Sequence, residues 1–136
     1  MKEIQTENVI RIAGEYFTKR DDVIFAYLFG SYAKDTQTDL SDIDIAIYMK
    51  PDLKYPSSDK LEIVSNLSSL LKTDRIDLVI MNQAPTSLIS RILAYKIILV
   101  DKEPHKRHAF ESLNMRKGFD FSFIEKQILE DRYLNG

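Results

Sequence analysis

Cysteine is absent from this chain of 136 residues. Its absence excludes disulfides and metal sites built on thiolates, so the protein needs no oxidising compartment. Long apolar runs are missing too, because the apolar stretch of residues 23–33 falls well short of the roughly 20 residues of a membrane-spanning helix. Residues 1–8 are charged where a signal peptide is apolar. We therefore expect a cytoplasmic protein with no membrane partner.

An excess of charge of one sign is also lacking. The chain carries 19 Lys and Arg against 21 Asp and Glu, a net charge of −2. No basic field exists to attract nucleic acid, and we expect no direct nucleic-acid binding. An apolar content of 44% with 29% charged residues favours a folded domain over disorder. Without repeats or a linker, residues 1–136 are expected to form a single domain.

Several catalytic motifs are missing. His105 and His108 are the only histidines. Without cysteine they make a poor zinc site, and a solvated helix start explains them better. The chain has no phosphate loop of the Gly-x-x-x-x-Gly-Lys type and no Ser/His/Asp or Cys/His set. P-loop ATPases and hydrolases of those kinds are therefore excluded.

Four segments have the pattern of strands. Residues 23–29 are continuously apolar, which predicts a strand buried on both faces. Residues 42–49 alternate, with isoleucines and a methionine on one face and carboxylates, Ala and Tyr on the other. Residues 75–82 and 97–100 are the third and fourth strands.

Helical spacing connects these strands. We predict helices over about 5–19, with Thr6 as N-cap, and from a capping box of Asp59 and Glu62 to about residue 72. Pro85 suits the first position of the next helix. The predicted buried helix positions are Val9, Ile12, Ala13, Tyr16, Phe17, Leu61, Val64, Leu67, Leu70, Leu71, Leu88, Ile89, Ile92 and Leu93. Alternating strands and helices imply a small sheet covered by helices, with the strand order left open.

The remaining residues, about 104–134, are predicted to be mostly helical with a break at Gly118. Three aromatic residues, Phe119, Phe121 and Phe123, follow this glycine. They either pack into the core or form a surface that binds a partner.

Two carboxylates at positions 42 and 44 are the first chemical signal. Asp42 and Asp44 point to the same face of their strand, since side chains alternate with period 2. Like charges so close are unfavourable unless a cation lies between them. Alternating carboxylates usually mark a solvated strand edge, but the opposite face of this strand is wholly apolar.

A Gly-Ser pair is the second signal. Gly30 and Ser31 end the first strand and open a short helix, where backbone N–H groups can meet phosphate. Gly30 also permits close approach of the backbone to a ligand. Lys34, one short turn on, either meets a phosphate or is an ordinary exposed lysine.

A third acid, Asp77, stands alone in an apolar run, where an unpaired buried charge would be costly. It could pair with Arg75, or reach Asp42 and Asp44 if the second and third strands are neighbours. Three carboxylates and substrate phosphates would complete the coordination of Mg²⁺. Together these residues indicate metal-dependent phosphoryl or nucleotidyl transfer.

The combined motif resembles the DNA polymerase β-type nucleotidyltransferase superfamily over about residues 8–100. It is most similar to the minimal nucleotidyltransferases (MNT), antitoxins that are paired with a HEPN-domain toxin. The resemblance implies an α/β (α+β) fold with a mixed sheet, two Mg²⁺ ions and ATP as substrate. The motif comprises Gly30-Ser31-x-Ala33, Ser41-Asp42-x-Asp44 and Asp77.

The resemblance also implies roles. Gly30 and Ser31 would hold the triphosphate, Asp42 and Asp44 would bind metal, and Asp77 would bind metal and activate the acceptor. That acceptor would be a tyrosine hydroxyl of the HEPN ribonuclease, which one or several AMP units silence.

One departure from the family pattern is Asp35, where many relatives have glycine. Asp tolerates the left-handed backbone better than most residues, although its charge could weaken triphosphate binding. Two other functions stay open: a small-molecule nucleotidyltransferase of the aminoglycoside type, and a non-catalytic antitoxin that acts by binding alone.

Overall fold

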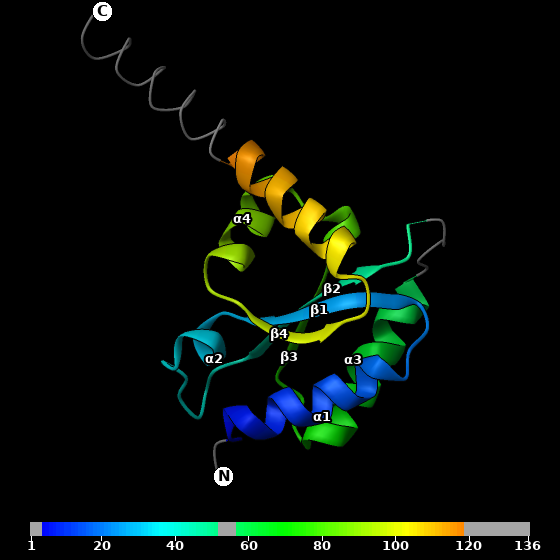
Figure 1. The fold of residues 1–136 in the computed structure, drawn as a ribbon. Coiled ribbons are helices and arrows are strands. Elements are labelled where there is room, and N and C mark those ends of the chain that lie inside the picture. Colours follow the sequence, from blue (N-terminus) through cyan, green and yellow to red (C-terminus); the bar gives the residue numbers. More distant parts are fainter. Residues whose placement is uncertain (1–3, 52–56, 119–136) are drawn as a thin grey trace, which may run out of the picture.

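Helices and strands alternate along the chain in the computed structural model, which describes residues 4–51 and 57–118 (Figure 1). The helices are α1 (Thr6–Thr18), α2 (Ser31–Lys34), α3 (Ser57–Leu71) and α4 (Thr86–Ala94), with a 3₁₀ turn, η1 (Met81–Gln83). The strands are β1 (Val23–Phe29), β2 (Ile43–Met49), β3 (Ile76–Ile80) and β4 (Ile97–Asp101). Residues 104–118 form a further helix, called here helix 104–118.

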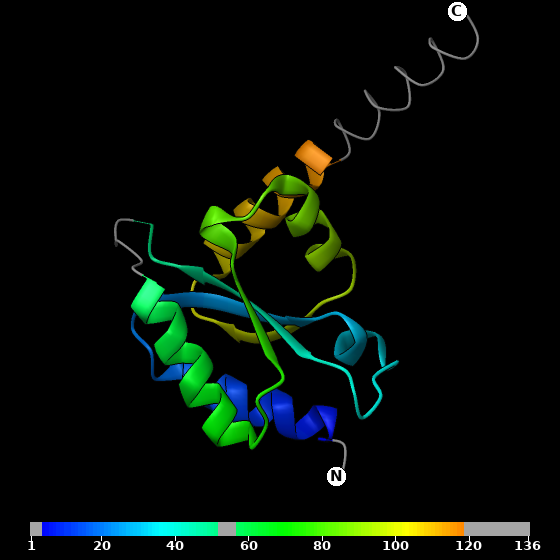
Figure 2. The same cartoon turned by 180° about the vertical axis from the view of Figure 1, so that it is seen from behind.

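The strands form one mixed sheet of order β3-β2-β1-β4. β1 is antiparallel to both β2 and β4, whereas β2 and β3 run parallel. Figure 2 shows β3 crossing in front of β2, on the side away from β4. The mixed sheet that the family resemblance implied is thereby confirmed. Its strand order places the two acid-bearing strands side by side.

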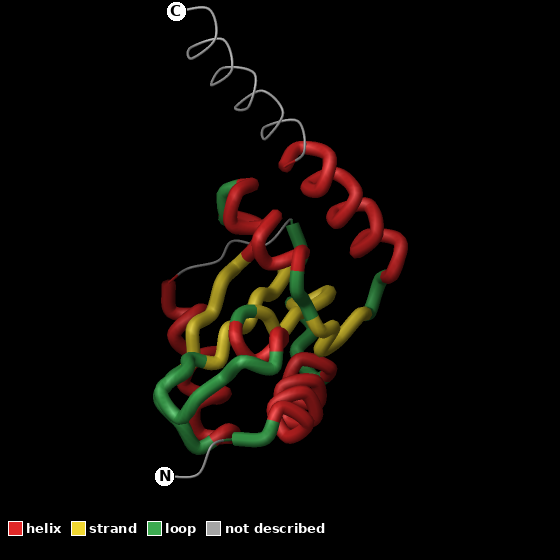
Figure 3. The backbone as a smooth tube through the Cα atoms, turned by 90° about the vertical axis from the view of Figure 1, so that its left-hand side faces the viewer, coloured by secondary structure: helices red, strands yellow, loops and turns green. Residues whose placement is uncertain are grey.

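Helices cover both faces of the sheet, with the strands between two helical layers (Figure 3). Helices α1 and α3 lie on one face, where Phe17 and Leu67 share a core cluster with Ile45 of β2. Helix α4 and helix 104–118 lie on the other face, where Ile92 and Phe110 belong to a second cluster. The sheet therefore separates two apolar cores.

The inner strands follow their sequence patterns. Every residue of β1 from Val23 to Leu28 is buried, as the continuous apolar run predicts. In β2, the isoleucines and Met49 enter the α1–α3 core, while Ala46 and Tyr48 belong to the other cluster. The alternation predicted for this strand is confirmed, and it leaves Asp44 on the α4 side.

Three predictions about the helices are wrong. Gln5, not Thr6, caps α1, and the Thr6 hydroxyl instead accepts a hydrogen bond from Gln37. Helix α3 begins at Ser57, so Asp59 lies inside its first turn and no capping box starts there. Leu61 and Leu70 are 69% and 48% exposed, because α3 turns the stripe of Ile63, Leu67 and Leu71 towards the sheet.

The C-terminal region is described only as far as residue 118. Gly118 is still helical, so the described part contains no break at this position. A Cβ there would lie 2.3 Å from the Ser90 hydroxyl of α4, so the glycine permits close packing of two helices. Phe119, Phe121 and Phe123 lie outside the described residues. Within the described ranges, no helix combines the length and apolar character needed to span a membrane.

Candidate active site

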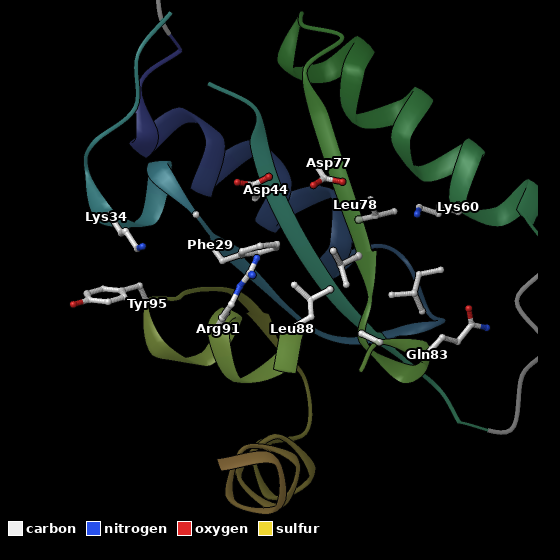
Figure 4. Close-up of a pocket in the computed structure, with 14 residues that line it drawn as sticks. Phe29, Lys34, Asp44, Lys60, Asp77, Leu78, Gln83, Leu88, Arg91 and Tyr95 are labelled. Carbon is white, nitrogen blue, oxygen red and sulfur yellow. The ribbon is translucent and has the colours of Figure 1, made fainter. Parts of the chain in front are cut away.

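The sheet brings two of the predicted acids together. Asp44 of β2 and Asp77 of β3 are register partners in the parallel pair (Figure 4). Neighbouring strands lie about 4.8 Å apart, and equivalent side chains point to the same face. The condition set by the sequence, that these two strands be neighbours, is therefore met.

Asp77 is exposed rather than buried, so the expectation of a costly buried charge is wrong. Its position opens onto the space between β3 and α4, which solvent or a ligand can reach. Arg75 donates a hydrogen bond to the carbonyl oxygen of Leu40, at 2.7 Å. Among the ion pairs of the described residues, none joins Arg75 to Asp77, which leaves the carboxylate available for chemistry.

The acids influence one another electrostatically. Partial burial, together with the negative charges of Asp77 and Asp42, raises the pKa of Asp44 to about 6. Asp42 itself lies just before β2 and is exposed. The three carboxylates thus form a region of negative charge that a cation would relieve.

Gly30 is fixed against this acidic group by its backbone. It has φ 72° and ψ −150°, a conformation that is essentially restricted to glycine. A Cβ at this position would lie 2.1 Å from Oδ2 of Asp44. The glycine therefore serves two purposes: it makes the turn after β1, and it lets the backbone touch the Asp44 carboxylate.

The short helix after Gly30 carries the other predicted nucleotide-binding residues. The amides of Ala33 and Lys34 donate to the carbonyl oxygen of Gly30, which closes α2. Asp35 then takes the left-handed conformation, with φ 58° and ψ 37°. The prediction that aspartate can replace the usual glycine in this turn is confirmed for the backbone.

A cavity of about 650 Å³ adjoins these residues. Four predicted site residues, Gly30, Lys34, Asp44 and Asp77, line it, whereas Ser31 and Asp42 do not. Of the last two, Ser31 is half-buried at the start of α2, and Asp42 is exposed just before β2. The structure therefore brings four of the six candidates to one cavity and leaves two at its margin.

Sequence reasoning missed the opposite wall of the cavity. Residues of η1 and α4 form this wall, while Phe29 of β1 and Lys60 of α3, which lies beside Leu78 in Figure 4, also line the cavity. The residues Ala84, Leu88, Arg91 and Tyr95 line the cavity at spacings of four, three and four. Only Leu88 and Arg91, one turn apart, lie on α4 itself, whereas Ala84 precedes the helix and Tyr95 follows it; the spacing was visible in the sequence. Only the strand order reveals that these residues face the acids.

The residues fit a hard cation that takes further ligands from a substrate. Within the described ranges, no group of three His, Cys, Asp or Glu side chains is arranged to hold a metal ion alone. Mg²⁺ is commonly bound by one or two carboxylates with the rest of its shell supplied by phosphates and water. Asp44 and Asp77 are two such carboxylates, with Asp42 as a nearby third.

The histidines take no part in this site. His105 and His108 are exposed on helix 104–118, as the sequence analysis expected. Nε2 of His108 lies 3.1 Å from a guanidinium nitrogen of Arg107. Neither histidine lines the cavity that contains Asp44 and Asp77.

A mixed sheet that pairs two carboxylates beside a glycine turn defines a protein with the polymerase β-like nucleotidyltransferase fold. Residues 13–105 match the family described as Polymerase beta, Nucleotidyltransferase, and the chain belongs to this family. The match contains every residue of the predicted site. A comparison with curated protein sequences gave no match.

Several solved structures share the fold over nearly the whole chain. One is a chain of a toxin–antitoxin complex with AMP-PNP, at 24% identity and a TM-score of 0.71, covering 93% of this chain and 96% of that one. Another, at 23% identity and a TM-score of 0.68, is a complex of a tri-AMPylated HEPN toxin with an MNT antitoxin from Shewanella oneidensis, covering 93% and 97%. A third is the MntA–HepT toxin–antitoxin pair, at 22% identity and a TM-score of 0.67, again covering 93% and 97%. At these identities the likeness establishes the fold.

Proposed function

We propose that this protein is a Mg²⁺-dependent nucleotidyltransferase that transfers AMP from ATP to a tyrosine hydroxyl of a HEPN-family toxin. It would thereby act as the antitoxin. The observation that carries the chemistry is the pairing of Asp44 with Asp77 across β2 and β3, next to Gly30. The acceptor is supported by the similar fold of an MNT antitoxin solved with an AMPylated HEPN toxin.

The reaction forms one bond and breaks one. The acceptor oxygen attacks the α-phosphorus of ATP, the bond from that phosphorus to the bridging oxygen of the β-phosphate breaks, and pyrophosphate leaves. Asp77, exposed at the cavity, accepts the proton of the attacking hydroxyl. When bound, Mg²⁺ would be held by Asp42, Asp44 and Asp77, and it would neutralise the charge that develops on the phosphates.

Positioning is the main task of the remaining residues. Gly30 and Ser31 open α2 beside the acids, and we assign the triphosphate to their backbone amides. Lys34 lines the same cavity and supplies a positive charge. Holding the reactants in line in this way accounts for much of the catalysis of such transfers.

The direct test uses a lysate of the native host with ATP labelled at either the α- or the γ-phosphate. The proposal expects a protein band labelled from the α-phosphate only, since pyrophosphate is lost. An Asp42→Asn/Asp44→Asn double variant is the control and should give no band. Arg11→Gln, a substitution on the exposed surface of α1, should label as the wild type does.

Two other outcomes would contradict the proposal. Labelling of an aminoglycoside-like small molecule in place of a protein would assign the site to small-molecule modification. Equal protection of cells from the toxin by the wild type and the double variant would show that binding alone neutralises the toxin.

A further inference from the structure

The candidate active-site cavity has chemically different ends. Figure 4 shows Lys34, Tyr95 and Arg91 at one side of the cavity and Gln83 at the other, with the two acids on the sheet between them. The wall towards Gln83 is mainly apolar and includes residues 78–80 of β3 and Leu88 of α4, but Lys60 of α3 also lies at this end, beside Leu78. A long ligand that crosses the acids would therefore have one end near two cations, Lys34 and Arg91, and the other against a mainly apolar surface with one cation, Lys60.

Arg91 is a cation with no carboxylate partner. No ion pair among the described residues includes it, although Asp44 and Asp77 line the same cavity. The guanidinium therefore lies more than 4 Å from the oxygens of both carboxylates. The side chain extends from α4 into the cavity, towards Phe29 and the side of Asp44 (Figure 4).

The other cation at this end already has a contact. Lys34 Nζ lies 5.1 Å from the ring centroid of Tyr95, within the range of a cation–π interaction. Lys34 comes from α2 and Tyr95 ends α4, so this contact joins the two walls beside Arg91. The cationic end is thus bounded by two elements, and Arg91 faces the acids across it.

We propose that Arg91 binds the β- and γ-phosphates of the nucleotide and so makes the site selective for triphosphates over monophosphates. This inference rests on the proposed function, which places the α-phosphorus at Asp44 and Asp77. With the α-phosphorus there, the apolar end suits the base and ribose, and the β- and γ-phosphates extend to the cationic end. A guanidinium suits that place because its planar fork binds phosphate oxygens in pairs.

A structural role for Arg91 makes a different prediction. Arg91 lies in the last turn of α4, where a positive charge stabilises the helix dipole. In that role its removal would lower the melting temperature of the free protein and affect all nucleotides alike. In the proposed role its removal lowers the affinity for ATP while leaving that for AMP unchanged.

The experiment is calorimetric titration of the purified chain with ATP and AMP in the presence of Mg²⁺. Arg91→Gln should weaken ATP binding by about tenfold to a hundredfold, the value of a charge-assisted hydrogen bond to a phosphate, with AMP affinity unchanged. Arg91→Lys keeps the charge without the fork and should give an intermediate loss. Arg11→Gln, which removes an exposed arginine of α1, should change neither affinity.

The outcomes separate the role of Arg91 from the proposed function on which it rests. Equal loss of ATP and AMP affinity in Arg91→Gln, or no loss at all, overturns the role of Arg91 and leaves the proposed function standing. Failure of the wild-type protein to bind ATP overturns the proposed function itself. Melting temperatures of all variants show whether a loss of binding reflects a loss of folding.

Discussion

At the scale of single residues, the site depends on contacts that substitutions can change one at a time. Gly30 touches Asp44, and Asp44 stands beside Asp77. Each of these residues is constrained by its neighbour as well as by its own backbone. The effects of substitutions at these residues can therefore be predicted from their contacts.

Gly30→Ala should impair both folding and nucleotide binding. A side chain at φ 72° and ψ −150° is strained by about 1–3 kcal/mol, and its Cβ would collide with the Asp44 carboxylate. Chemical denaturation should show the lower free energy of unfolding, and titration with ATP should show weaker binding. Asp35→Gly, at the other left-handed turn of α2, is the control and should change stability little. Wild-type stability in Gly30→Ala would contradict the described contact.

Asp44→Asn should stabilise the protein without ligand, in a pH-dependent way. Partial burial and the charges of Asp77 and Asp42 raise the pKa of Asp44 to about 6, above its ordinary value of 3.8. The folded state therefore holds this proton more tightly than the unfolded state, and ionisation destabilises the fold progressively as pH rises from about 4 to about 6.

The size of this effect is set by solvent screening. Since Asp44 is only half-buried, we discount the shift to ~1 kcal/mol, or about 3 °C in melting temperature at pH 7.5. Below pH 4 both proteins carry a neutral side chain at this position, and the difference should vanish. Thermal melts at pH 7.5 and pH 3.5 measure it. A variant that melts below the wild type at pH 7.5 would contradict this electrostatic account.

At the scale of elements, a polar network fastens helix 104–118 to the sheet. The hydroxyl of Tyr27 in β1 donates to Glu111 at 2.6 Å, and Arg107 joins Glu111 at 3.1 Å and Asp101 at 2.8 Å. Burial favours the neutral form of Glu111, but the Tyr27 hydroxyl, Arg107 and Lys96 outweigh it and hold its pKa below the ordinary value. The network is mostly shielded from water, so removing one of its partners leaves an uncompensated charge and costs more than breaking a surface ion pair.

Arg107→Ala should loosen this helix. The substitution leaves Asp101 and Glu111 without their main cation and should cost about 2 kcal/mol of stability. Hydrogen exchange of the amides of helix 104–118 should accelerate. Lys106→Ala is a matched control on the same helix, because its ion pair with Glu103 is exposed and worth little. Equal protection of the helix in both variants would show that apolar packing alone holds it.

The sequence predicts those elements that are determined by a local pattern, and it fails for those that depend on long-range packing. The continuous apolar run of β1 and the alternation of β2 are local patterns, and both strands form as predicted. The predicted start of α3 at Asp59 is wrong. An aspartate with a glutamate three residues later matches the capping-box pattern wherever it stands in a helix, and the helix begins two residues earlier, at Ser57. The side of α3 that is buried depends on its angle to the sheet, which no local pattern contains.

The same limit applies to the candidate site. Asp42, Asp44 and Asp77 were recognisable because carboxylates stand out in apolar strands. Arg91 was not, since an arginine on a helix has many uses and only the fold places it opposite the acids. Strand order depends on long-range packing, and it is this order that brings the acids of separate motifs together at one cavity.

At the scale of the whole molecule, the sheet and α4 together form a cavity suited to a nucleotide. The acids come from the inner strand β2 and the edge strand β3, the cations from α2, α3 and α4, and the apolar surface mainly from β3 and α4. No single element carries the site, so its integrity depends on the complete fold. Ligand binding should therefore stabilise the entire domain.

In the function proposed above, the paired acids modify a protein partner. The most direct measurement is the intact mass of the HEPN toxin purified after co-expression with this chain or with the Asp44→Asn/Asp77→Asn variant. We predict a toxin heavier by one or more whole AMP units with the wild type and an unmodified toxin with the variant. A toxin of unmodified mass that is nonetheless inactive beside the wild-type protein would contradict the claim.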